Sequence, residues 1–216
     1  MPGKAARGRL IAVEAARGRD AARGAAKVRA ALRSKRRDIR AGISHWDASG
    51  TFYELRMAGR KVRALSPRTL LLLYASDLAF RLRWEIGPAL ADGRVVIAAP
   101  YLETAIAFGE AAGLPGKWIA ELFRFAPRAD VCLHVKSGKG APEWKRRPMD
   151  GFPEFGAAAL GDGKASRSGS PWCEQAAAAL RRLKRASRCE DLRKKSLGPL
   201  LKSLRDRRPR PHSKER

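Results

Sequence analysis

Three short apolar runs divide the first 136 residues of the chain. Residues 10–14 (LIAVE), 94–99 (RVVIAA) and 130–135 (DVCLHV) are rich in small and β-branched residues and show no alternation of polar and apolar positions. Such runs are typical of strands that are covered on both faces, as in a parallel sheet. Residues 37–44 alternate weakly and predict one more strand.

Helical patterns fill the intervals between these runs. Ser66 and Pro67 mark a helix start, because the hydroxyl can cap free N–H groups and the proline ring has the φ of a first helical turn. Strands that alternate with long helices predict an α/β fold with a mainly parallel sheet and helices on both faces. The expected helices cover residues 21–34, 52–64, 66–91, 102–125 with a break at 113–116, 171–186 and 190–206.

Both ends of the chain and one internal stretch differ from this pattern. Residues 1–8 are small and basic and predict a disordered N-terminus, and residues 191–216 predict a basic C-terminal helix and tail. Residues 137–170 are rich in Gly, Pro, Ser and Lys, which is typical of a loop or lid. The remainder, residues 9–190, has the length of one domain.

No apolar run has the length of a membrane span. The clearest one, residues 70–75, is far shorter than the roughly 18–20 residues that cross a bilayer. The N-terminus also lacks the apolar segment and cleavage site of a secretory signal. We therefore expect a cytoplasmic protein without a membrane partner.

The cysteines and histidines are scattered. No Cys-x-x-Cys pair occurs, and no histidine lies near another in sequence; the residues concerned are Cys132, Cys173, Cys189, His45, His134 and His212. This pattern predicts neither a disulfide framework nor a metal site, and it favours a reducing compartment.

The formal charge of +25 is concentrated at the two ends. Residues 1–40 hold 13 basic against 3 acidic side chains, and residues 181–216 hold 15 against 4. A basic terminus can bind nucleic acid by releasing condensed counterions, which gives affinity without sequence specificity. The alternative is a compositional bias, because the chain is rich in Arg, Ala, Gly and Pro throughout.

A series of spaced motifs resembles the thymidylate kinase family. The series consists of residues 70–77 (LLLLYASD), 86–93 (IGPALADG), 95–97, Tyr101, 107–108, Gly113, Trp118 and 128–130, with weaker similarity at 49–51 and 10–14. The resemblance covers roughly residues 9–136. It implies a P-loop fold, ATP and magnesium as cofactors, and transfer of the terminal phosphate to thymidine monophosphate.

The family's phosphate loop is altered in this chain. It resembles Gly-x-x-x-x-Gly-Lys-Ser/Thr, in which glycines admit phosphate, the lysine reaches the outer phosphates and the hydroxyl holds magnesium. Residues 15–22 read AARGRDAA, so that Ala15 and Asp20 replace the glycines. Ala21 and Ala22 replace the lysine and the hydroxyl. Positive charge could still come from Arg17, Arg19 or Arg23 around Gly18, although solvated surface arginines are the alternative interpretation.

Other phosphate-handling positions are altered as well. The family's Asp-Arg-Tyr is Ala99-Pro100-Tyr101 here, and Leu78 stands where an arginine commonly holds the acceptor phosphate. The family's Arg-Glu-Pro-Gly-Gly-Thr corresponds to residues 46–51 (WDASGT), again without the arginine.

Several retained residues match the family's acceptor and base pocket. Tyr74, Tyr101 and Phe108 would line that pocket, or would simply pack in the core. Asp77 would contact the acceptor nucleotide, or would pair with Arg81 one helical turn later.

The segment that resembles the family's lid carries a short basic run. Lys145, Arg146 and Arg147 would approach the phosphates from this lid-like loop, or would be solvated. The pattern therefore favours a thymidylate-kinase-like pseudoenzyme that binds a nucleotide or a macromolecule. The alternatives are an active dTMP kinase with an atypical loop, which would use ATP and magnesium, and a non-specific nucleic-acid-binding protein. The family resemblance also suggests a homodimer formed through residues 70–79.

Overall fold

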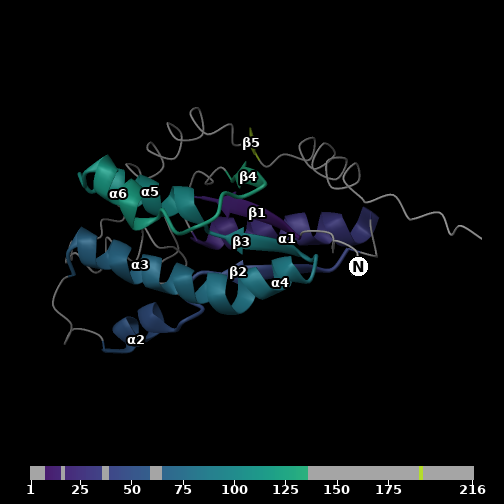
Figure 1. Ribbon diagram of the computed structural model, residues 1–216, viewed down its shortest axis with the longest axis horizontal. Coiled ribbons are helices and arrows are strands. Elements are labelled where there is room, and N and C mark those ends of the chain that lie inside the picture. Colours follow the sequence, from purple (N-terminus) through teal and green to yellow (C-terminus); the bar gives the residue numbers. More distant parts are fainter. Residues whose placement is uncertain (1–7, 16–17, 36–38, 59–64, 136–189, 192–216) are drawn as a thin grey trace, which may run out of the picture.

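A five-stranded sheet, in which all pairings are parallel, forms the centre of the molecule (Figure 1). The computed structural model describes residues 8–15, 18–35, 39–58, 65–135 and 190–191. The strand order is β2-β3-β1-β4-β5. The strands are β1 (Arg9–Glu14), β2 (Ala41–His45), β3 (Val95–Ala99), β4 (Val131–His134) and β5 (Glu190–Asp191).

Strand β1 lies in the middle of the sheet and pairs with both β3 and β4. Ile11 is opposite Ile97 on one side and Val131 on the other. Alternate residues of β1 enter two separate apolar clusters, as the period of two along a strand requires. Ile11 and Val13 belong to one cluster, and Leu10 and Ala12 belong to the other. The predicted α/β class, with a parallel sheet covered on both faces, is confirmed.

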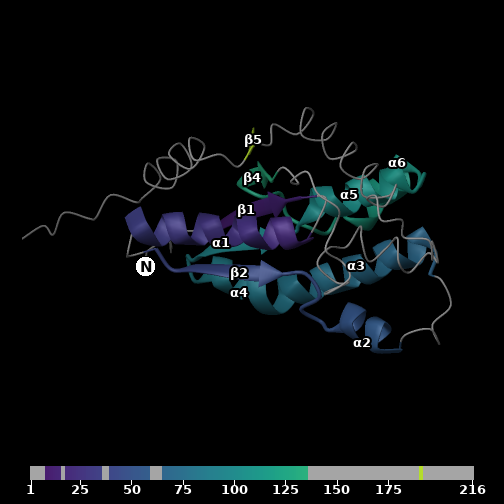
Figure 2. The same cartoon turned by 180° about the vertical axis from the view of Figure 1, so that it is seen from behind.

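Helix α1 (Gly18–Lys35) covers one face of the sheet (Figure 2). Its buried side is made of small and branched residues, among them Ala21, Ala25, Val28 and Leu32. The other face is covered by α3 (Pro67–Arg81), α4 (Gly87–Ala91), α5 (Leu102–Ala111) and α6 (Gly116–Leu122). A short helix, α2 (Thr51–Ala58), packs against α3.

The long helix expected from residue 66 to 91 contains an internal π-helical segment. The Ser66 hydroxyl accepts a hydrogen bond from the Thr69 amide, as the sequence predicts for this cap. After α3, η2 (Leu82–Ile86) is π-helical, and the Gly87 amide donates to the carbonyl of Leu82. Pro88 has no amide hydrogen and cannot continue regular α-helical bonding, which accounts for a π segment at this point. A Cβ on Gly87 would lie 2.6 Å from the Leu82 oxygen, so only glycine fits.

The remaining boundaries differ modestly from expectation. The weakly alternating strand predicted at 37–44 is β2, which begins and ends later. The helix expected at 52–64 corresponds to α2, which ends at Ala58. The last part of the expected helix, residues 59–64, lies outside the described residues. The expected break at 113–116 separates α5 from α6, and Gly113 has a positive φ of 73°. The predicted helix at 190–206 is wrong for its first two residues, because the backbone of Glu190 and Asp191 pairs with β4.

Several predictions lie outside the described residues. They concern residues 1–7, the lid-like loop at 137–170, the helix at 171–186 and the tail after residue 191. Among the residues that are described, no helix combines the length and the apolar character needed to cross a bilayer.

Candidate functional site

The carboxyl ends of β1, β3 and β4 meet at one edge of the sheet. Because these strands are parallel, Glu14, Ala99 and His134 are brought to this edge together. The first turns of α1 and α5 begin beside it. In open α/β sheets this edge is the usual place for ligands, which makes it the candidate site.

Glu14 occupies the N-terminus of α5. Its carboxylate accepts hydrogen bonds from the amides of Tyr101, Glu103 and Thr104 at 3.0–3.1 Å. It also accepts one from the Thr104 hydroxyl at 2.6 Å. Burial raises the pKa of Glu14, and the bonds from Thr104 and the two other amides oppose that rise. The amides of Tyr101, Glu103 and Thr104, which could otherwise hold an external anion at α5, are therefore already bonded within the protein.

Asp20 lies in the first turn of α1. One of its carboxylate oxygens is buried and has no hydrogen-bond partner within the described part of the chain. Ala15 and Ala21 are buried in the apolar cluster beneath α1, and Gly18 is the first residue of the helix. Arg23 is exposed one turn further along. Residue Arg17 and the side chain of Arg19 lie outside the described residues.

Arg81 is a fully buried cation at the same edge, and sequence reasoning did not identify it as a site residue. Its Nε and Nη2 donate to the hydroxyl and the carbonyl of Ser44, each at 2.9 Å. Its Nη1 donates to the Pro100 carbonyl at 3.1 Å. The Ser44 hydroxyl in turn donates to Glu85 at 2.5 Å. All three guanidinium nitrogens are bonded to the protein. The spacing from Tyr74 and Leu78 to Arg81 places it on the buried face of α3, which is the signal that could have identified it.

Asp77 organises the loop between β2 and α2. Its carboxylate accepts hydrogen bonds from the amides of Asp47 and Ser49, both at 2.9 Å. Asp47, which has a positive φ of 60°, accepts bonds from the amides of Phe52 and Tyr53 at the start of α2. Asp77 and Arg81 therefore bind different partners and form no ion pair, so the pairing offered as one interpretation is not made.

The three aromatic candidates are buried together. Tyr74 and Phe108 are inaccessible to solvent, and Tyr101 is 1% exposed. The Tyr74 hydroxyl donates to the Tyr101 carbonyl, and the Tyr101 hydroxyl donates to the Pro127 carbonyl at 2.7 Å. Burial raises the pKa of both tyrosines well above the ordinary value. These contacts favour the packing interpretation; the role in binding a base stays a prediction.

Glu103, Cys132 and His134 form a cluster of ligand-type side chains. One oxygen, sulfur or nitrogen atom from each lies within 4.8 Å of the others, and His134 Nε2 is 2.7 Å from Glu103. Cys132 is disulfide-bonded, and its partner lies outside the described residues. The cysteine spacing predicted no disulfide framework, and it gave no sign of the bond at Cys132. A disulfide sulfur is not a thiolate, so we assign no metal to the cluster.

Comparison with known proteins finds several probable thymidylate kinases that are similar to parts of this chain. A probable thymidylate kinase of Pyrococcus abyssi is 40% identical over 62 residues, which are 29% of this chain and 30% of the relative. One of Staphylothermus marinus is 29% identical over 85 residues, 39% of this chain and 43% of the relative. Probable thymidylate kinase 2 of Saccharolobus solfataricus is 27% identical over 101 residues, 47% and 46% of the two chains. These matches relate the chain to the thymidylate kinase family.

The similarity to the thymidylate kinases is partial. The chain matches less than half the length of each of these relatives. No protein-family profile matches it. The parallel sheet agrees with the P-loop-type fold that the resemblance implies, with β1 entering the altered loop and α1 following it.

Three altered positions of the thymidylate kinase motifs, Asp20, Ala21 and Pro100, follow β1 or β3 at the described edge. Ala21, where the family has lysine, is a fully buried methyl group, and Asp20 adds a carboxylate beside it. Pro100, where the family has arginine, accepts a bond from Arg81. Leu78, in place of a further arginine, is buried in the core. The lid residues Lys145, Arg146 and Arg147 lie outside the described residues.

Proposed function

We propose that this protein is a catalytically degenerate relative of the thymidylate kinases that acts by binding rather than by phosphoryl transfer. The observation that carries the proposal is the electrostatic character of the candidate site. The carboxylates of Glu14 and Asp20 lie at this edge, and the buried methyl group of Ala21 stands where the family has lysine. The guanidinium of Arg81 is buried and bonded to Ser44 and Pro100.

Phosphoryl transfer depends almost entirely on positioning and on stabilising charge at the phosphates. A site with a carboxylate at the phosphate loop and no lysine lacks both. Loss of one such group commonly lowers a rate by about a hundred-fold or more. Because several phosphate-handling residues are replaced in this chain, we expect a phosphoryl-transfer rate far below that of a working kinase.

The retained core supports a binding role. Tyr74, Asp77 and Arg81 each make specific hydrogen bonds that join α3 to β2, β3 or the loop after β2. A scaffold kept in this order can present a surface to a nucleotide or to a macromolecule. We keep the active dTMP kinase as the competing function, with the lid arginines supplying charge.

A coupled assay with thymidine monophosphate, ATP and magnesium tests the proposal. We expect no turnover above that of a heat-denatured control. Turnover at an ordinary kinase rate, on the order of 1 per second or faster, would reject the proposal. A thermal-shift screen of nucleotides with and without magnesium then identifies any small ligand, because a ligand that binds the folded state raises the melting temperature.

Large apolar side chains on α3 and η2 are exposed and could form a contact between two copies of the chain. Leu72, Phe80 and Trp84 are 51%, 40% and 65% exposed. They support a homodimer formed through this region as a proposal. Sedimentation of the wild type and of a Leu72→Glu variant tests it, since a charge in such an interface should leave only monomer.

A further inference from the structure

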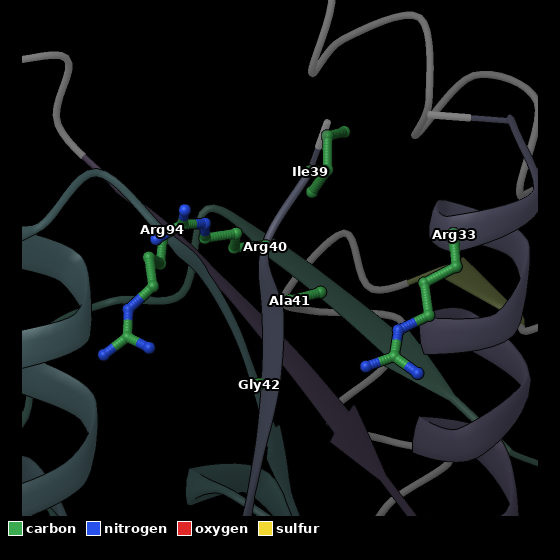
Figure 3. Close-up of a pocket in the computed structure, with 6 residues that line it drawn as sticks. All are labelled: Arg33, Ile39, Arg40, Ala41, Gly42 and Arg94. Carbon is green, nitrogen blue, oxygen red and sulfur yellow. The ribbon is translucent and has the colours of Figure 1, made fainter. Parts of the chain in front are cut away.

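A hollow at the amino ends of the strands, opposite the candidate site, is lined by three arginines (Figure 3). Arg33 comes from the last turns of α1, Arg40 precedes β2 and Arg94 precedes β3. The rest of the lining is Ile39, Ala41 and Gly42, and the volume is about 480 Å³. In Figure 3 the side chains of Arg33 and Arg94 lie on opposite sides of strand β2.

This hollow is separate from the candidate nucleotide site. Arg40 and Arg94 stand at the amino ends of parallel strands, whereas Glu14 and Tyr101 stand at the carboxyl ends. A five-residue strand spans roughly 16 Å, which sets the distance between the two edges. The three arginines therefore form a site of their own at the amino ends of the strands.

The arginines of the hollow are available to a ligand. All three are exposed, and no ion pair within the described ranges involves Arg33 or Arg40. Arg94 lies 3.5 Å from Asp92, but both side chains are about half exposed or more. Exposed pairs of this kind contribute little, so Arg94 can exchange its partner for a phosphate.

The exposed side of α1 carries further basic residues, and we call it the α1 basic side. Arg23, Lys27 and Arg33 are exposed on this helix, and Arg29 is partly exposed between them. Arg23 and Lys27 are four residues apart and share one flank of this side, and Arg29 and Arg33 share the other flank. From Arg23 to Arg33 the α1 basic side extends about 15 Å at the rise of an α-helix. The one acidic residue of α1, Asp20, is in its first turn, at the far end from the hollow.

Strand β2 adds backbone donors to these cations. It is the edge strand of the described sheet and pairs with β3 alone, so its outer amides have no strand partner. A Cβ built on Gly42 would meet nothing within 4 Å, which shows that the backbone can be approached closely there. Amides and guanidinium groups together are the donors that phosphate oxygens take up.

We infer that the hollow and the α1 basic side bind the phosphodiester backbone of a nucleic acid. The cations continue from the hollow along the helix, which suits a chain of phosphates better than one small anion. The net charge of +25 would attract such a polymer. The inference rests on the binding role proposed above and names its partner, but its test is independent of the kinase assay.

The test uses the full chain and a fluorescent single-stranded oligonucleotide of mixed sequence, with anisotropy measured over a range of salt concentrations. Replacing Arg33, Arg40 and Arg94 together by Gln should weaken binding about tenfold or more at low salt. The slope of log K against log salt is negative, and each lost phosphate contact makes it less steep by about 0.7. The slope of the variant should therefore be less negative by roughly 2. Unlabelled oligonucleotide should displace the probe, whereas ATP at equal nucleotide concentration should not.

The matched control removes three equal charges elsewhere. Arg68, Lys117 and Arg124 are exposed near the start of α3 and on or just after α6, away from β2 (Figure 1). Their replacement by Gln should change affinity less than threefold, with circular dichroism verifying that both variants are folded. Equal losses in the two variants, or no binding by the wild type, would overturn the site. Displacement by ATP as effective as that by oligonucleotide would overturn the nucleic-acid assignment.

Discussion

The carboxylate of Glu14, at the end of β1, is 2.6 Å from the hydroxyl of Thr104 in the first turn of α5. This bond and those from three neighbouring amides join the centre of the sheet to the helix that follows β3. An internal carboxylate thus takes the position at a helix N-terminus that a bound anion often takes.

Protonation of Glu14 should make folding stability depend on pH. Burial raises its folded-state pKa above the value near 4.5 expected for the unfolded chain. The folded state then holds the proton more tightly, so this contribution is fully present below pH 4.5 and is lost as pH rises through the folded pKa. Urea unfolding should show that the free energy of unfolding of the wild type falls relative to that of Glu14→Gln as pH rises from 4.5. A difference that is constant with pH would contradict this assignment.

Replacement of Arg81 should destabilise the fold strongly. In Arg81→Met the carbonyls of Ser44 and Pro100 lose their donor inside the core. An unsatisfied buried group costs about 1–3 kcal/mol, and two groups are affected. Arg81→Lys keeps the charge, but its three donors are on one nitrogen and cannot match the spread of the guanidinium nitrogens that reach Ser44 and Pro100, so we expect an intermediate loss. Chemical denaturation measures both variants, and a Lys variant as stable as wild type would show that charge alone matters.

A side chain at Gly109 should force the terminal methyl groups of its neighbours to shift. A Cβ there would lie 2.7 Å from Ile119 and 2.8 Å from Leu71, between α5, α6 and α3. Gly109→Ala should therefore cost about 1–3 kcal/mol through overpacking. Gly116→Ala is the matched control, because a Cβ at that position meets nothing within 4 Å. Thermal unfolding should show a lower melting temperature for the first variant and an equal or higher one for the second.

The fold was predictable where the pattern of apolar residues along the chain matches the burial of the element. Continuous apolar runs identified β1, β3 and β4 because both faces of these strands are covered, and Ser66 marked the start of α3 through its cap. The pairing of β5 was not predictable, since Glu190 and Asp191 carry no strand pattern and are fixed by contact with β4. The disulfide of Cys132 likewise depends on proximity in space, which cysteine spacing does not report.

The candidate site was predictable only as a set of missing residues. Comparison with the family motif located Asp20, Ala21 and Pro100, because a motif fixes position along the chain. The role of Arg81 depends on Ser44 and Pro100, which lie 37 and 19 residues away in sequence. Nothing local in the sequence records such a contact.

Removal of the Asp20 charge should increase affinity for phosphate at the altered loop. The carboxylate lies in the first turn of α1, where the helix dipole favours an anion and where a bound phosphate would be repelled. A charge at this position is typically worth about 0.3–1 kcal/mol, so Asp20→Asn should bind inorganic triphosphate roughly two- to five-fold more tightly. Titration calorimetry measures the change. Glu121→Gln removes one exposed charge on α6 and should leave the affinity unchanged; an equal gain in that variant would assign the effect to net charge instead of to the loop.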